Sequence, residues 1–224
     1  MTNNIIKQDD IMNLLGCCYD KCLNGAPAVS KSVPELAEDY LKKDVSRKKA
    51  CKKMLKNQIV KCGTSGFLTG FGGIITLPVS IPANVGSVIY VQMRMIACTA
   101  YMAGYDLDSD QTQTFVYACL AGVAVNNLIV KKIGVPTGVK IANNMINKIP
   151  GTALTKINRA VGARFVTKFG EKGIINLGKS VPIFGAILGG CFDVVETKII
   201  AKRAYRWFMK GEFTIKKDED MIKK

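Results

Sequence analysis

The 224-residue chain contains no histidine. This absence excludes Ser-His and Cys-His catalytic pairs, histidine metal ligands and a histidine pH switch. A hydrolase built from this chain would need lysine or aspartate as the base that activates its nucleophile, and no such arrangement is visible in the spacing of the residues. The sequence therefore predicts no catalytic residue, no metal site and no cofactor.

The chain also lacks a Cys-x-x-Cys pair, although it has eight cysteines. Several of them lie in apolar segments of helical spacing, where cysteine acts as a small hydrophobic residue. Cys18 and Cys22 share a helix face without histidine partners, which predicts packing rather than a zinc site. No basic leader followed by an apolar run is visible at the start, and Thr2 does not fit the myristoylation pattern. We therefore expect reduced thiols and a cytoplasmic location.

Acidic residues are scarce in part of the second half of the chain. The formal net charge is +15, and residues 131–180 carry ten basic residues against one acidic residue. A field of this sign attracts phosphate groups, whether they belong to anionic lipid or to nucleic acid. The charge therefore predicts an anionic partner without deciding between these two classes.

One long segment has no charge at all, namely the 32 residues from Cys62 to Met93. Such a segment is expected to be buried, either in the protein core or in a lipid bilayer. Its glycine-rich part, Gly63–Leu77, would measure about 22 Å as a helix, which is shorter than the ~30 Å hydrocarbon core. A shallow insertion, a re-entrant hairpin or a place in the core fits this length better than full spanning.

Small residues and prolines organise this segment. Glycines at helical spacing predict close helix packing, and two prolines break the segment near its middle. These residues are Gly66, Gly70, Gly73, Pro78 and Pro82.

Helical periodicity occurs along the chain, and no convincing strand alternation is visible. We therefore expect an all-α fold, a compact bundle of long antiparallel helices with glycine-rich apolar helical hairpins. The predicted helices cover residues 1–24, 46–62, 82–102, 109–133 and 191–210, and one further helix begins at Ser32. Asp108 is the predicted N-cap of the helix at 109–133.

Two of these helices are basic and amphipathic, which is typical of helices that lie on anionic membranes. The alternative is an ordinary helix that packs on the core with its charged face in water. The residues predicted to contact lipid or another anion are Lys48, Lys52 and Lys56 in the first helix, and Lys198, Lys202, Arg206, Lys210 and Trp207 in the last.

Several motifs follow one another in a characteristic order. A glycine-rich apolar run and a Pro-x-x-x-Pro break lead to Gln92-Met-Arg94 and then to Tyr101-Met-Ala-Gly-Tyr-Asp106. Val181-Pro-x-x-Gly185-Ala-x-x-Gly-Gly190 and Ala204-Tyr-Arg-Trp-Phe208 follow near the C-terminus. This order resembles the EcsC family, and the resemblance covers roughly residues 48–210.

The resemblance implies a helical fold and a membrane-linked context, because the family is named from an open reading frame that accompanies an ABC transporter. It implies no reaction. The family motif and packing residues are the glycines and prolines named above together with Arg94, Pro182, Gly185 and Gly189. The sequence departs from the family pattern at Ser80, where an acidic residue is usual, and at Asp193, where asparagine or a small polar residue is usual.

We accordingly expect three regions along the chain. These are an N-terminal helical extension (1–45), an EcsC-like helical domain (46–210) and a polar C-terminal tail (211–224).

Arg94 is the only cation between Lys61 and Lys131. A cation in such an apolar setting needs a partner. We expect an ion pair with Asp106, Asp108 or Asp193, and the alternative is an anionic ligand.

The leading hypothesis is a non-enzymatic, membrane-associated helical protein that is peripheral or shallowly inserted. Its basic helices would bind anionic head groups, and its glycine-rich hairpins would enter or lie against the bilayer. The expected partners are an anionic membrane surface and a membrane transporter or other protein. The alternative is a soluble nucleic-acid- or protein-binding helical module, although no basic-aromatic platform is recognisable. A hydrolase is the third hypothesis.

Overall fold

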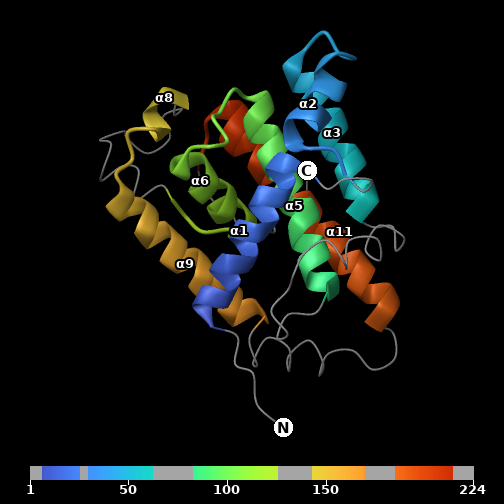
Figure 1. The fold of residues 1–224 in the computed structure, drawn as a ribbon. Helices are drawn as coiled ribbons and strands as arrows, with labels where there is room; N and C mark the ends of the chain where they lie inside the picture. Colours follow the sequence, from blue (N-terminus) through green and yellow to red (C-terminus); the bar gives the residue numbers. More distant parts are fainter. Residues whose placement is uncertain (1–6, 26–29, 63–82, 126–142, 170–184, 214–224) are drawn as a thin grey trace.

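The computed structural model describes residues 7–25, 30–62, 83–125, 143–169 and 185–213. Within these ranges the protein is all-helical, as predicted, and no strand occurs there. Figure 1 shows the helices packed into a compact bundle. The elements are α1 (Gln8–Asn24), α2 (Val33–Leu41), α3 (Arg47–Cys62), α5 (Ala83–Met102), α6 (Asp110–Ala121), α8 (Asn143–Ile146), α9 (Gly151–Phe169), α11 (Gly185–Ala204) and the π-helical turn η1 (Tyr205–Met209).

Helix α5 lies at the centre of the bundle and contacts α1, α2, α3, α6, α11 and η1. It contains the last part of the charge-free segment, where Tyr90, Val91 and Met93 are fully buried. The predicted helix over 82–102 is confirmed, and the chain leaves it through Gly104 at a φ of 87°, which favours glycine. This part of the segment therefore forms protein core, whereas residues 63–82 lie outside the described ranges.

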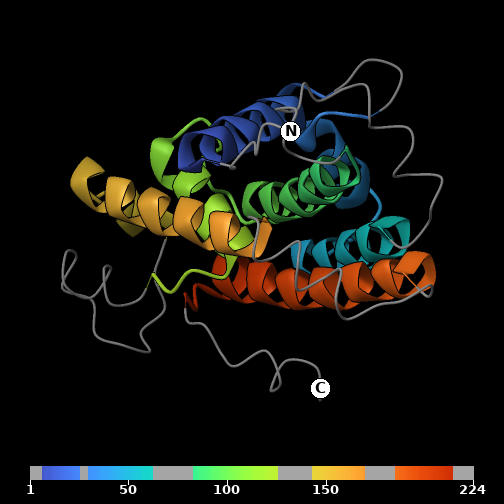
Figure 2. The ribbon, with the colours of Figure 1, turned by 90° about the horizontal axis from the view of Figure 1, so that it is seen from below.

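The other helices form two groups on different sides of α5. Helix α9 packs on α1 and α6, whereas α3 packs on α2, α5 and α11. In Figure 1, α9 lies on the left and α3 on the right, whereas α11 runs from the right toward the centre, and the perpendicular view in Figure 2 keeps α9 and α3 apart. The arrangement places α3 and α9, the two most basic of the described helices, on different sides of the molecule.

Side-chain caps fix where α2 and α6 begin. The predicted start at Ser32 is confirmed, because Ser32 and Glu35 form a reciprocal capping box at the head of α2. The predicted cap of α6 was Asp108, but Ser109 occupies that position, and its hydroxyl accepts a hydrogen bond from the amide of Thr112 at 3.3 Å. The helix expected to reach residue 133 ends instead at Ala121, because Gly122 adopts a left-handed cap with a φ of 69°.

The last predicted helix begins earlier and changes its winding. Helix α11 starts at Gly185, and the five residues of η1 continue it as a π-helical turn. This turn directs Trp207 and Phe208 into the core, where Phe213 packs against both rings. The aromatic packing therefore reaches beyond residue 210.

Candidate anion-binding surface

Helix α3 separates apolar from basic residues. Its inner side packs on α5 and α11 through Ala50, Cys51, Met54 and Leu55, all of which are buried. The helix carries seven basic residues and no acidic residue over its 16 positions. The lysines at 48, 49, 52, 53, 56 and 61 are exposed. Helix α3 therefore presents an outer side of one charge sign.

The position of Lys52 shows which way one row of these lysines points. Its ammonium nitrogen lies 5.6 Å from the ring centroid of Tyr205 in η1, which is a cation–π geometry. Lys48 and Lys56 lie one helical turn before and after Lys52 and therefore share its side of α3. The predicted row Lys48, Lys52 and Lys56 thus lies on the side of α3 that adjoins the α11–η1 helix.

A second row meets the first from the α11 side. Lys202 precedes Tyr205 by three residues, and Lys198 lies one turn before Lys202, so both share the side of the helix that Tyr205 occupies. Both lysines are exposed. We use the name lysine seam for the set that follows this line between the two helices: Lys48, Lys52, Lys56, Lys198 and Lys202.

A contact at the other end of the two helices fixes their relative direction. The hydroxyl of Thr197 donates a hydrogen bond to Sγ of Cys62 at 3.4 Å, while Lys52 meets Tyr205 nearer the start of α3. Helices α3 and α11 therefore run antiparallel, and their lysines follow the same line. Thr197 in turn accepts a hydrogen bond from Nε2 of Gln92 in α5 at 3.0 Å, which ties this pair of helices to the central helix.

The structure separates Trp207 and Arg206 of the predicted set from the lysine seam, and the prediction for Lys210 is not tested. Trp207 is a correction, because its side chain is fully buried and packs at 5.5 Å from Phe213, so it contacts the core and not the surroundings. Nε of Arg206 lies 3.7 Å from Oε2 of Glu212 on a side chain that is 12% exposed. Lys210 is exposed beyond η1. The π-helical turn interrupts the regular spacing on which the row was predicted.

Carboxylates gather on the neighbouring helix α2. This helix carries Glu35, Glu38 and Asp39 and no basic residue. Ion pairs join Lys31 to Asp39 at 2.6 Å and Lys53 to Asp44 at 2.8 Å. Acidic groups of α2 and of the loop that follows it therefore lie near α3.

Two open cavities lie at this acidic end of the molecule. One of about 380 Å³ is lined by residues that include Arg47, Tyr105 and Asp106, and one of about 420 Å³ is lined by residues that include Lys31 and Lys42. Both are lined by Glu38. Each cavity carries charges of both signs and contains no residue of the lysine seam, so neither selects an anion.

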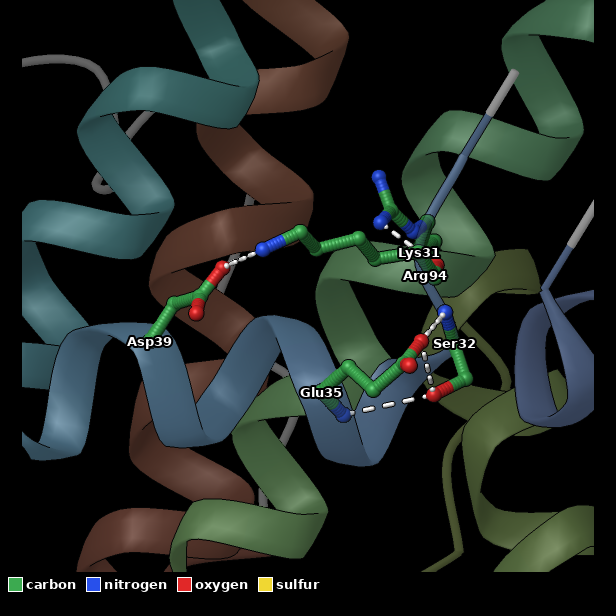
Figure 3. Close-up of polar contacts among 5 residues, drawn as sticks. All are labelled: Lys31, Ser32, Glu35, Asp39 and Arg94. Atoms are coloured by element: carbon green, nitrogen blue, oxygen red, sulfur yellow. Dashed lines mark hydrogen bonds and ion pairs between the residues drawn. The ribbon is translucent and has the colours of Figure 1, made fainter. Parts of the chain in front are cut away.

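Arg94 has a structural partner on the main chain. Its side chain is 4% exposed, and Nη2 donates a hydrogen bond to the carbonyl oxygen of Lys31 at 2.7 Å. Figure 3 shows this contact beside the capping box of Ser32 and Glu35. Arg94 therefore holds the segment that begins α2.

Among the described residues, no ion pair joins Arg94 to Asp106 or Asp108, and the pair with Asp193 stays a prediction. A side-chain oxygen of Asp106 accepts a hydrogen bond from the amide of Asp108 at 3.0 Å within their own loop. The side chain of Asp193, the third predicted partner, lies outside the described part.

Comparison with known families agrees with the motif order. A family model described as the EcsC protein family matches residues 21–210, which is most of the chain. The chain belongs to the EcsC family. The match begins before the 48–210 region that carried the resemblance, and it includes the end of α1 and the whole of α2. No curated protein and no solved structure matches the chain.

The EcsC motif residues are described only in part. Gly185 and Gly189 lie in the first turns of α11. The other predicted packing residues lie outside the described ranges: Gly66, Gly70, Gly73, Pro78, Pro82 and Pro182. Close helix packing at these positions stays a prediction.

Sequence reasoning missed a second buried arginine in the EcsC domain. Arg203 is 5% exposed, and its Nη1 donates a 2.6 Å hydrogen bond to the carbonyl oxygen of Cys119 in the last turn of α6. A cation at a helix C-terminus complements the helix dipole. A Cβ added to Gly122 would lie 3.2 Å from the guanidinium nitrogens, so the glycine leaves room for this cap. The sequence offered one signal for this helix end, namely a glycine, Gly122, directly after an apolar helix.

The buried cysteines are poor nucleophiles. Burial raises the pKa of the Cys18, Cys51 and Cys119 thiols to about 12, which keeps them protonated near neutral pH. Within the described residues, no group of three acidic or cysteine side chains is placed to hold a metal ion. Among the described helices, none combines the length and hydropathy that crossing a bilayer requires.

Proposed function

We propose that this EcsC protein is a non-enzymatic protein that binds the surface of anionic membranes through the lysine seam. The observation that supports this most directly is the meeting of two lysine rows, from helices far apart in the sequence, along one line. Helix α3 contributes no carboxylate to that line. Phosphate-bearing head groups are the chemical class that such a line attracts.

The choice of lysine suits a surface better than a single small ligand. Lysine carries its charge on a long flexible stem with no preferred planar geometry, whereas arginine forms a fixed fork that suits one bidentate partner. Each lysine near an anionic surface contributes about 1 kcal/mol, and the attraction falls off within a Debye length. The proposed binding is therefore cumulative and sensitive to salt.

A peripheral mode of binding is supported by the position of α5. Tyr90 and Met93, at the end of the charge-free segment, pack in the centre of the bundle. Moving them into lipid would expose the inner sides of the surrounding helices. The proposed contact therefore uses the outer surface, on the cytoplasmic side of the membrane, and insertion by the glycine-rich hairpins stays a separate prediction.

A non-enzymatic role is supported by the state of the thiols. The cysteine chemistry of the core is suppressed by burial, as the raised thiol pKa of Cys51 and Cys119 indicates. We include a membrane transporter or another protein as a possible partner on the membrane, in keeping with the setting of the EcsC family.

The test is flotation of the protein with vesicles of graded anionic lipid content. We expect binding that increases with anionic lipid and is released by high salt. Changing Lys48, Lys52 and Lys56 together to glutamine removes about 3 kcal/mol of attraction, which lowers the partition coefficient roughly 100-fold. The matched control changes the exposed lysines Lys21, Lys42 and Lys43 to glutamine and removes the same net charge elsewhere.

Three outcomes would contradict the proposal. Equal losses in the seam variant and the control would show that only the net charge matters. Retention of the protein in the soluble fraction at every lipid composition, with a salt-dependent shift of DNA or RNA in a gel, would favour the nucleic-acid alternative. Binding that resists both high salt and carbonate would indicate insertion instead of surface contact.

A further inference from the structure

Helix α9 carries a second basic surface. It has four basic residues and no acidic residue over 19 positions, and all four of these residues are exposed. We use the name α9 face for the pair Lys156 and Arg159, which lie three residues apart in its N-terminal half and therefore adjoin on the helix. Lys156 and Arg159 belong neither to the lysine seam nor to the acidic end of the molecule.

The orientation of the α9 face is fixed by the packing beneath it. Ile157 and Val161 are fully buried, in the side of the helix that packs on α1 and α6. A Cβ at Gly162 would lie 2.4 Å from Cγ of Gln8, so glycine allows α1 to approach closely. Nε2 of Gln8 also donates a hydrogen bond to the carbonyl oxygen of Arg159 at 3.1 Å. The basic pair therefore points away from the bundle.

The α9 face and the lysine seam lie on different sides of the molecule. Helix α9 packs on α1 and α6. Helix α6 contacts α11 directly, and both α1 and α6 contact α5, which in turn contacts α3. Both perpendicular views keep α9 apart from α3 (Figures 1 and 2). With helix axes about 8–10 Å apart, the three steps to α3 give a separation of roughly 25 Å, and the two steps through α6 to α11 give roughly 18 Å.

An ion pair brings α9 and α11 together at the far end of α9. Lys168, in the last turn of α9, forms an ion pair with Glu196 of α11. Lys156 lies 12 residues earlier, or about 18 Å along the helix axis. The helices therefore converge at that end, and the basic pair lies away from it.

This distance decides what the α9 face contacts when the seam is bound. The Debye length is about 8 Å at physiological ionic strength, so a membrane at the seam exerts little attraction on charges roughly 18 to 25 Å away across the bundle. The α9 face then remains open to a second anionic surface. Its exposed cations are opposite in charge to phosphate-bearing head groups, as are the cations of the lysine seam.

We propose that the protein joins two anionic membranes, one at the lysine seam and one at the α9 face. This proposal rests on the proposed function, because it needs the seam to bind a membrane first. The occupant of the α9 face is a second bilayer that carries anionic lipid. No covalent step is involved, and the joining is reversed by high salt.

The experiment measures binding and clustering of the same anionic vesicles, by flotation and by dynamic light scattering. The α9 variant changes Lys156 and Arg159 to glutamate, and the matched control changes Lys42 and Lys43 to glutamate. We expect the full-length protein and the control to cluster vesicles. We expect the α9 variant to float with vesicles whose mean radius stays that of vesicles alone.

A second α9 variant, Lys156→Gln with Arg159→Gln, removes both charges without introducing acidic groups and so guards against misfolding. Circular dichroism checks both variants. Clustering that survives in the folded α9 variants overturns the proposal. So does flotation of the unaltered protein without clustering, which leaves the proposed function standing. Absence of flotation overturns the proposed function itself, and with it the joining of two membranes. Capture of nucleic acid by the α9 face, with no clustering, overturns the proposal in favour of a different partner.

Discussion

The buried arginines and the exposed lysines of this protein carry the same charge and do different work. Arg94 and Arg203 lie inside, and each donates a hydrogen bond to a main-chain carbonyl that begins or ends a helix. The lysines of the seam lie outside. A buried cation is costly unless its donors are satisfied, so the interior uses arginine to fix backbone. An exposed cation is hydrated, so the surface uses lysine to attract a partner.

The largest expected effect of a substitution is at Trp207. The sequence pattern placed this residue with the surface lysines, whereas the structure places it in the core. Trp207→Ala is expected to cost about 3–5 kcal/mol of the free energy of unfolding, since a large ring among aromatic neighbours is lost. Chemical denaturation followed by circular dichroism measures the loss. Lys210→Ala is the control on an exposed residue, with an expected change within about 0.5 kcal/mol.

The same tryptophan reports on its own surroundings, because it is the only one in the chain. Its fluorescence should remain insensitive to quenchers carried on lipid tails when vesicles are bound. A Trp207→Ala variant as stable as the unaltered protein, or strong quenching by lipid, would return Trp207 to the membrane surface.

The error over Trp207 shows what a sequence pattern can and cannot predict. Helix type and the charge of each helix follow from local spacing, so the all-α fold and the rows at Lys48–Lys56 and Lys198–Lys202 could be predicted. The π-helical turn at Tyr205–Met209 depends on packing between elements and shifts the register of the residues after it. The convergence of the two rows depends on a contact between residues 153 positions apart, Lys52 and Tyr205.

The partner of a buried cation was equally beyond local spacing. A search for carboxylates predicted an ion pair for Arg94, whereas the contact that the described residues show is with the carbonyl of Lys31. Carbonyl groups occur at every residue, so the sequence does not distinguish the one that is used.

Arg203 allows the next test, of intermediate size. Arg203→Ala removes a charge-assisted hydrogen bond to the carbonyl of Cys119 and leaves the end of α6 without its cap, which is expected to cost about 2–3 kcal/mol. Arg203→Lys should cost less than Arg203→Ala, because lysine keeps the positive charge and loses only the planar guanidinium fork. Lys202→Ala, one residue earlier and exposed, is the control. Equal effects at 202 and 203 in urea denaturation would mean that burial does not separate the two cations.

The smallest expected effect belongs to the lysine seam. Changing Lys48, Lys52 and Lys56 together to glutamine should alter the free energy of unfolding by no more than about 0.5 kcal/mol per residue, because exposed charges contribute little to folding. Loss of mutual repulsion offsets loss of the contact between Lys52 and Tyr205. Thermal denaturation measures the change. Helix α3 carries seven cations and no carboxylate, so these charges repel one another and are not expected to stabilise the fold. A large destabilisation would therefore mean that the seam holds α3 to α11 instead of binding a partner.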